Sequence, residues 1–271
     1  MKRTSLQALV LLMTTLFFSC SSPKSSESDQ SNLDPVTEAA TKLGPEKYSV
    51  YKAPVSFDYP NSKLKMTAPE TLLSPGETAF NFEVTEYELG VQTPDAAARG
   101  IANSGKGQHI HFILNNDPYS AHYEPEFNKE LPEGKHVLLA FLSRSYHEAV
   151  KNDSSYVLKE LIVGTPPEDE PQFDAMAQHL FYSRPKGTYS GKDTEKLMLD
   201  FFLFNTEISP DGNKVRASIN GEEHLLTEWA PYHIEGLEKG EVTIKLELLD
   251  KDGNLIPGPY NSVERKVMLT E

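Results

Sequence analysis

The amino-acid sequence predicts an all-β protein, with two tandem immunoglobulin-like β-sandwich domains that follow a signal peptide and a flexible stalk. Three observations predict this fold: a long internal repeat, apolar residues that alternate with polar ones, and hairpin-turn residues between the alternating runs. Helix-like patterns are few. The best two, residues 35–43 and 173–180, lie outside the repeat.

The N-terminus has the pattern of a secretory signal peptide. Lys2 and Arg3 precede an apolar stretch over residues 6–18, which ends shortly before Cys20. This stretch is shorter than the about 20 residues that a membrane-spanning helix needs, and no later segment reaches that length. We therefore expect residues 1–19 to be a cleaved signal and the mature chain to lack a transmembrane helix.

Cys20 is the only cysteine, so an internal disulfide is excluded. In this setting the N-terminus resembles that of bacterial lipoproteins, which are cut before a cysteine that carries diacylglycerol. Ser19 fits the small residue before the cut, whereas Phe17 and Phe18 depart from the usual Leu-Ala or Leu-Ser, and Ser21 resembles the pattern of outer-membrane sorting. The resemblance implies a lipid anchor on Cys20 and an outer-membrane lipoprotein of the cell envelope. The alternative is a free surface cysteine.

The remaining chain divides by composition. Ser, Asp and Glu dominate the segment after Cys20, and its few apolar side chains cannot offset the entropy of ordering, so we expect a flexible stalk over residues 20–47. Two domains of common size then fit at 48–163 and 186–271, joined by a Pro-rich, acidic linker at 164–185.

The net charge of −14 argues against nucleic acid as a partner.

A long segment of the mature chain occurs twice: residues 107–163 recur as residues 212–269. After one inserted residue the register holds to the end of both copies. An earlier strand also recurs less closely, at 82–89 and 201–208, so the repeated unit is a whole domain. Corresponding residues include Asn115 and Asn220, Ile110 and Val215, His109 and Lys214, His111 and Arg216, and Gly134 and Gly240.

Alternation of residue types predicts the strands. In residues 215–219 and 243–248, apolar residues alternate with polar and charged ones, which is typical of strands with one buried face. Asn220-Gly221 and Asp252-Gly253 lie between such runs and accept the positive φ of tight hairpins. Short strands with turns at this spacing predict a β-sandwich.

Positions that differ between the two copies are freer to carry function. The first difference is the connection over residues 90–106, which is longer than its counterpart in the second copy. We expect it to contain one short helical turn capped by Asp95. A long ordered loop on a rigid sandwich is often a binding element, and a neutral surface insertion is the alternative.

The second difference is chemical: His109 and His111 replace a lysine and an arginine of the second copy. Alternation puts both imidazoles on one face of a strand, where they can chelate zinc or copper. His122 or His147 could add a third nitrogen. The alternative is a hydrogen-bonded or stacked pair without metal.

The third difference is an apolar outer face. Val137, Leu139 and Phe141 stand where the second copy has Thr, Lys and Glu. We expect this face to be covered by the long loop, by the neighbouring domain or by a ligand.

The segment over residues 143–148 is rich in hydrogen-bonding side chains. Such groups suit recognition of a polar ligand such as a sugar, a phosphate or a carboxylate, and they equally suit a structural network that supports a loop. The candidate ligand-binding residues are His109, His111, Tyr119, His122, Arg144, Tyr146, His147 and Glu148.

Residues 107–111, 142–148 and 248–254 resemble an uncharacterised family of bacterial lipoproteins, over nearly the whole mature chain. Some members carry the name phosphopeptide-binding protein, which implies a binding role. This chain lacks the Gly-Arg, Ser and Asn pattern of forkhead-associated domains, although Arg144 could bind a phosphate.

Motifs of known enzymes are absent from the sequence: it has no Gly-x-Ser-x-Gly, no Walker loop and no His-Glu-x-x-His. We therefore expect a non-enzymatic protein without a cofactor.

The sequence is compatible with three functions. The first is a membrane-anchored binding module for an unidentified polar ligand or protein, the second is a copper or zinc carrier that uses His109 and His111, and the third is a structural envelope component.

Overall fold

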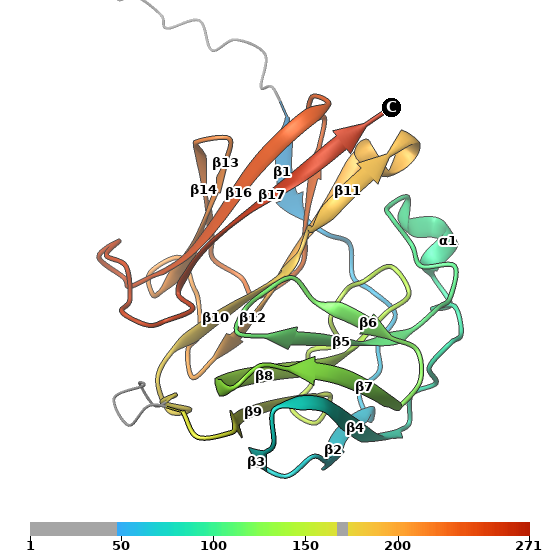
Figure 1. Ribbon diagram of the computed structural model, residues 1–271. Coiled ribbons are helices and arrows are strands. Elements are labelled where there is room, and N and C mark those ends of the chain that lie inside the picture. The colour runs from blue at the N-terminus through green and yellow to red at the C-terminus, as the bar shows by residue number, and fades with distance from the viewer. Residues whose placement is uncertain (1–47, 167–172) are drawn as a thin grey trace, which may run out of the picture. The chain divides into compact units, whose positions relative to one another are not determined.

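The computed structural model describes residues 48–166 and 173–271 (Figure 1). Strands dominate this part of the chain, and the helical elements found there are the short α1 (Ala96–Arg99) and one 3-10 turn (Gly191–Thr194). The expected signal peptide, Cys20, the stalk and the helix-like pattern at 35–43 lie outside the described residues. None of the described helices has the length and apolar character to cross a membrane.

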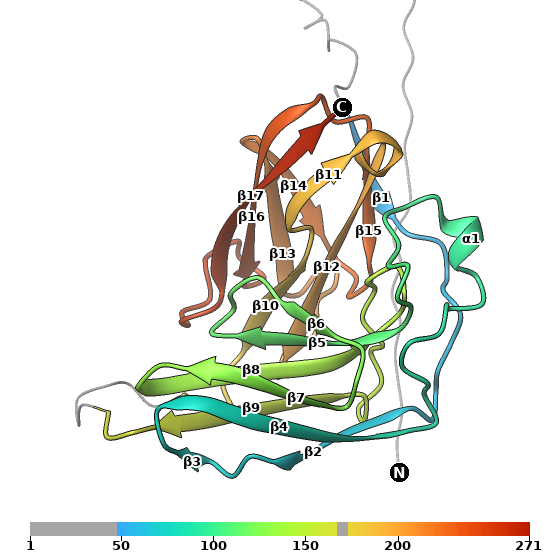
Figure 2. The same ribbon diagram turned by 45° about the vertical axis from the view of Figure 1, so that its right-hand side comes forward.

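The first sandwich has a three-stranded sheet in the order β2-β4-β7 and a five-stranded sheet in the order β3-β9-β8-β5-β6 (Figure 2). Its core contains the fully buried side chains of Phe80, Ile110 and Leu138. The strands are β2 (Lys63–Ala68), β3 (Leu72–Leu73), β4 (Gly76–Thr85), β5 (His109–Leu114), β6 (Ser120–His122), β7 (Glu126–Leu131), β8 (Gly134–Ser143) and β9 (Tyr156–Val163).

The second sandwich has a four-stranded sheet in the order β1-β15-β12-β10 and a five-stranded sheet in the order β11-β17-β16-β13-β14. Phe201, Val215 and Leu246 are fully buried in its core. The strands are β1 (Ser49–Lys52), β10 (His179–Arg184), β11 (Gly187–Ser190), β12 (Lys196–Phe204), β13 (Lys214–Ile219), β14 (Glu222–Leu226), β15 (Tyr232–Glu235), β16 (Gly240–Leu249) and β17 (Ser262–Thr270).

The five-stranded sheets of the two sandwiches have the same topology, which confirms the repeat predicted from the sequence. The order β3-β9-β8-β5-β6 matches β11-β17-β16-β13-β14, and in both sheets the first pair is parallel. The register also matches: His111 is opposite Phe141 in the first copy, as Arg216 is opposite Glu247 in the second. A comparison of the copies therefore compares equivalent positions.

The boundaries between the sandwiches differ from those expected. β1, which we placed in the first domain, pairs with β15 of the second sandwich. β10 falls inside the expected linker 164–185, and the helix-like pattern at 173–180 gives no helix, since its last two residues begin β10. All six residues of β10 are buried. A strand covered on both faces does not alternate, which is why the sequence pattern did not predict it.

The apolar outer face of β8 is covered by the second sandwich. Leu139 and Phe141 are fully buried and pack against Phe181 and Phe202 of β10 and β12. The Phe141 and Phe202 ring centroids lie 4.8 Å apart. The sequence allowed the long loop, the neighbouring domain or a ligand to cover this face, and the structure shows that the neighbouring domain does.

The long loop of the first copy packs onto the turn that follows β8. The Ser145 amide donates to Thr93 Oγ1 over 2.9 Å, and the Ser104 amide donates to the Ser145 carbonyl over 2.8 Å. The expected helical turn is α1, with Asp95 at its N-cap position, but the Asp95 side chain makes no capping hydrogen bond. Its carboxylate instead accepts from the Arg99 guanidinium and, over 2.9 Å, from the Phe57 amide.

Candidate metal centre

Three imidazoles converge beside the seam between the two sandwiches. His109 and His111 project from the outer face of β5, as alternation predicted, and His147 comes from the turn after β8. His109 Nε2 lies 2.9 Å from His111 Nε2 and 3.1 Å from His147 Nδ1. The three ligand nitrogens all lie within 4.8 Å of one another. Nitrogens that share an ion at about 2 Å lie a comparable distance apart, so the group has the size of a metal site.

The turn that carries His147 has a backbone conformation that favours glycine. His147 has a φ of 70°, and its counterpart in the second copy is Gly253, with a φ of 85°. The turns are otherwise alike: the amide of His147 donates to the Arg144 carbonyl, as that of Gly253 does to the Asp250 carbonyl. The first copy therefore carries a histidine at a position where the backbone itself would be less strained with glycine.

A backbone contact fixes the proton of His109. Its Nδ1 lies 2.8 Å from the Gly107 carbonyl oxygen, which can only accept, so we assign the proton to Nδ1. The lone pair of Nε2 then points toward the other two imidazoles. A carbonyl on the second nitrogen is the usual support of a metal-binding histidine. The Nδ1 atom of His111 is buried without a hydrogen-bond partner.

Burial keeps all three imidazoles neutral. It lowers the pKa of His109 to about 4 and holds the pKa values of His111 and His147 well below the usual value. The positive charge of Arg184 lowers all three pKa values further. Neutral imidazole is the form that binds metal, so the triad is ready to bind at neutral pH without losing protons.

Tyr119 connects the triad to the second sandwich. Its ring stacks on His111, with centroids 3.5 Å apart, and its hydroxyl lies 3.2 Å from His147 Nδ1. Arg184 donates to this hydroxyl over 2.6 Å, and Lys186 Nζ donates to the Tyr119 carbonyl over 2.7 Å. Tyr119 is therefore the predicted site residue that joins His109, His111 and His147.

His122 does not join the triad. It pairs with Ile110 across β5 and β6, so it lies on the core side of the sheet, opposite to His109 and His111. Its ring stacks on Phe127 with centroids 3.4 Å apart, and its Nε2 lies 2.8 Å from Ser120 Oγ. Of the two histidines that the sequence offered as a third ligand, His147 is the one placed with the pair.

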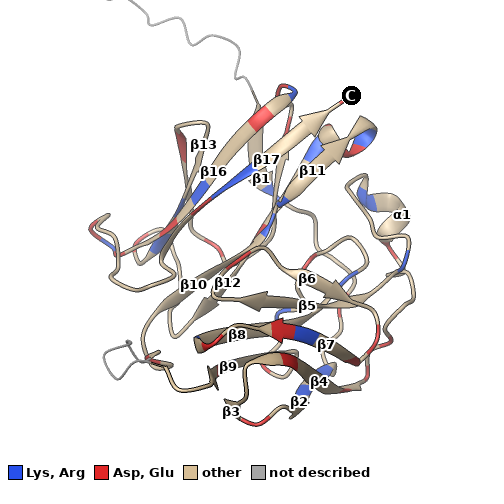
Figure 3. Ribbon diagram, in the orientation of Figure 1, with Lys and Arg blue, Asp and Glu red and all other residues tan. Residues whose placement is uncertain are grey.

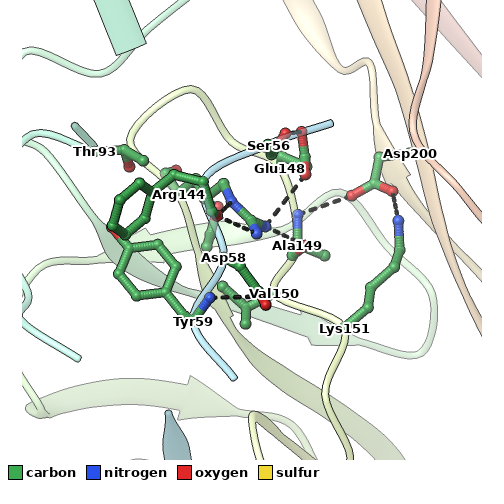
Figure 4. Close-up of polar contacts among 12 residues, drawn as sticks. Ser56, Asp58, Tyr59, Thr93, Arg144, Glu148, Ala149, Val150, Lys151 and Asp200 are labelled. Carbon is green, nitrogen blue, oxygen red and sulfur yellow. Dashed lines mark hydrogen bonds and ion pairs between the residues drawn. The ribbon is translucent and has the colours of Figure 1, made fainter. Parts of the chain in front are cut away.

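Arg144 and Glu148 form a structural network rather than an open site. The buried Arg144 guanidinium lies 3.2 Å from the Glu148 carboxylate and donates to the carbonyls of Phe57 and Ala149. Figure 4 shows Glu148 between Arg144 and Ser56, whose hydroxyl donates to it over 2.6 Å. The network holds the chain between the two sandwiches against the turn. Tyr146, also expected to bind ligand, is fully buried in a small cluster with Ile101 and Met198.

Two charged residues of the site were missed by sequence reasoning: Arg184 and Lys186. Arg184 ends β10 within the segment expected to be a linker, and Lys186 is the first residue of the expected second domain. The only local signal is a basic residue at the end of the apolar run 180–182, and it does not say what the residue contacts. Their place beside Tyr119 depends on how the two sandwiches pack.

An open groove lies beside β6. It is lined in part by Lys106, His122, Tyr123 and Glu124. The Tyr123 ring centroid lies 5.0 Å from that of His109, so Tyr123 separates the groove from the nearest imidazole.

Comparisons with known proteins give no family for this chain. No protein-family model matches it, and no curated protein matches it. Solved structures with similar folds include the fibronectin(III)-like modules of CbhA from Clostridium thermocellum, at 13% identity, covering 76% of this chain and 94% of that one, with a TM-score of 0.27.

Two further structures have comparable scores. The central fibronectin-III array of RIM-binding protein is 8% identical, with 80% and 72% coverage and a TM-score of 0.25. SGBP-B of the mixed-linkage glucan utilization locus of Bacteroides ovatus, solved in complex with a mixed-linkage heptasaccharide, is 14% identical, with 82% and 47% coverage and a TM-score of 0.21. At such scores these likenesses carry no argument about ligand or activity. The strand pairings themselves define the fold, and by them the chain is a tandem pair of duplicated, immunoglobulin-like β-sandwiches.

Proposed function

We propose that this protein is a binding module of the bacterial cell envelope that binds a transition-metal ion through His109, His111 and His147. One observation carries the proposal: the neutral imidazoles of the buried His109 and His111 and of the half-buried His147 face one another, with nitrogens 2.9 and 3.1 Å apart. Imidazole suits zinc, copper, iron and nickel. Within the described residues, the group contains neither a carboxylate nor a thiolate, so hard cations such as magnesium and calcium do not fit it.

The cost of the arrangement supports a function for it. His111 Nδ1 is buried without a partner, and His147 occupies a backbone conformation that favours glycine. The second copy avoids both costs with Arg216, which forms an ion pair with Glu247 at 2.8 Å, and with Gly253. Unpaired polar groups and unfavourable backbone in one copy of a duplicated fold point to a site with a use beyond stability.

Lipid anchoring at Cys20 and an outer-membrane location belong to the same proposal. The signal-like N-terminus and the position of the sole cysteine support them. Labelled palmitate should enter the wild-type protein in bacterial cells and not the Cys20→Ser variant. Equal labelling of both proteins would remove the anchor from the proposal.

Recognition of a polar ligand by residues 143–148 receives less support. The Arg144 guanidinium and the Glu148 carboxylate are engaged within the fold, and Tyr146 is buried. We therefore do not propose the sugar, phosphate or carboxylate site that the sequence also allowed.

Metal titration of the purified full chain with Cys20→Ser tests the proposal. We expect one copper or zinc ion per chain and a loss of affinity of more than about 100-fold in His147→Gly and in His109→Gln. His122→Gln is the matched control, because it removes an imidazole of the same sandwich outside the triad, and it should bind as the parent does. Unchanged binding in the His109→Gln and His147→Gly proteins would contradict the proposed site.

A further inference from the structure

We infer that the triad selects monovalent copper, Cu(I), over zinc and other dications, because two fixed positive charges of the second sandwich adjoin it. The inference rests on the proposed function and adds the charge of the ion to it. It follows from the donor set, from Arg184 and Lys186, and from the number of free donors around the triad.

The donor set contributes no negative charge. All three donors are neutral imidazoles, and strands β5 and β6 carry no Asp, Glu, Lys or Arg (Figure 3). Glu148, the acidic residue next to His147 in the chain, is bound by Arg144 and Ser56. A bound ion therefore keeps its full charge within a buried site.

Arg184 and Lys186 place two positive charges beside this site. Arg184 is 5% exposed, and its guanidinium reaches the Tyr119 hydroxyl, which itself lies 3.2 Å from His147 Nδ1. Lys186 Nζ lies 4.1 Å from the centroid of the Tyr119 ring. The Tyr119 side chain contacts both these cations and the histidines.

Neither cation is neutralised locally. Among the described residues, no carboxylate forms an ion pair with Arg184 or Lys186, and Arg184 Nε has no hydrogen-bond partner. Asp200, whose negative charge acts on Arg184, is already bound by Lys151 and by the Ala149 amide. Repulsion from a fixed charge is proportional to the charge of the ion, so it opposes Zn(II) twice as strongly as Cu(I).

The number of ligand atoms available to a metal ion also favours Cu(I). Zinc sites in proteins are almost always four-coordinate, and a site with three histidines needs a water or another side chain as its fourth ligand. The Tyr119 hydroxyl lies 3.2 Å from His147 Nδ1 but already accepts from Arg184 over 2.6 Å, so a zinc ion here would need a water as its fourth ligand. Cu(I) is stable with three nitrogen ligands, so the triad can satisfy it without Tyr119.

Competition titrations with Cu(I) and Zn(II) test the inference. The full chain with Cys20→Ser is used, because a free thiol would itself bind Cu(I), and Cu(I) is supplied without oxygen against a chromophoric chelator. We expect tighter binding of Cu(I) than of Zn(II). Arg184→Gln combined with Lys186→Gln should raise the Zn(II) affinity relative to that for Cu(I) by about tenfold or more. Arg184→Lys with Lys186→Arg keeps both charges and should leave the ratio unchanged.

The outcomes separate the two proposals. If the parent chain binds neither ion, the proposed function fails and the inference fails with it. If it binds Zn(II) more tightly, or if the neutral double variant keeps the parent ratio, metal binding stands and selection by charge is overturned. If the double variant does not fold, Lys186→Gln alone can replace it, because this side chain is only half-buried. We then expect a smaller rise in the Zn(II) affinity relative to that for Cu(I).

Discussion

His147 and Gly253 occupy the same position of the same turn, with φ values of 70° and 85°. Replacing His147 by glycine removes an unfavourable backbone conformation, although glycine also gains entropy in the unfolded chain. We expect the metal-free His147→Gly protein to be as stable as the wild type, or more stable by up to about 1 kcal/mol, while metal binding is lost. Urea unfolding and metal titration measure the two effects separately.

The second copy supplies the reverse experiment. A Cβ atom added at Gly253 meets no other atom within 4 Å, so the space is free and only the backbone is unfavourable. Gly253→His should therefore lower the free energy of unfolding by about 1 kcal/mol without creating a metal site. A large loss of stability in His147→Gly would show instead that this histidine serves the fold.

The buried imidazoles make the metal-free protein sensitive to acid. Burial lowers the pKa of His109 to about 4, whereas an unfolded histidine has a pKa of about 6.5. Between these values the unfolded state binds more protons, so stability is complete above about pH 6.5 and falls as the pH drops toward 4. His109 alone accounts for up to about 3 kcal/mol of this loss.

Urea midpoints at several pH values test this expectation. The wild-type midpoint should fall between pH 6.5 and pH 4, and the His109→Gln midpoint should fall less over the same window. Parallel curves for the two proteins would contradict the expected role of His109.

At the scale of elements, the long loop supports the turn that carries His147. Thr93 is 2% exposed, and its hydroxyl accepts from the Ser145 amide. Thr93→Val leaves that buried amide without a partner, which should cost about 1–3 kcal/mol and weaken metal binding by loosening the turn. Thr93→Ser retains the hydroxyl and is the matched control. Thermal unfolding and metal titration of the two variants measure the stability and the metal affinity. Equal values for Thr93→Val and Thr93→Ser would show that the Thr93 hydroxyl does not support the turn.

The elements differ in how far the sequence predicts them. Alternation was enough to predict β13, and the duplicated segment was enough to predict β5 and an equivalent sheet around it. β10 is buried on both faces, so its residues do not alternate and the local pattern does not predict it. β1 is short and pairs with a strand far along the chain, so the local pattern predicts neither the strand nor its partner. Once residues 109–114 are taken as a strand, the alternation of side chains places His109 and His111 on the same face.

The rest of the site depends on tertiary structure. Whether His122 or His147 completes the triad depends on the face of β6 and on the backbone of a turn, which one sequence does not give. Arg184 approaches Tyr119 across the contact between the sandwiches. Residues that meet only through domain packing leave no periodic signal in the chain.

At the scale of the whole described region, the aromatic contact between the sandwiches should determine whether they unfold together. Phe202 is fully buried and contacts Phe141 of β8, Tyr156 of β9 and Trp229. Phe202→Ala should cost about 3–5 kcal/mol and split one unfolding transition into two in calorimetry. Leu225→Ala, a change at a side chain 58% exposed, should preserve a single transition near that of the wild type. One sharp transition for Phe202→Ala would show that the sandwiches are coupled elsewhere.

The pairing of β1 with β15 has a mechanical consequence. The chain contributes a strand to the second sandwich, forms the whole first sandwich, and then returns to complete the second. Tension applied to the chain ahead of Ser49 is therefore borne first by the β1–β15 ladder. A pull on this end would therefore have to separate the edge strand β1 before load passed through residues 53–59 to the turn that carries His147.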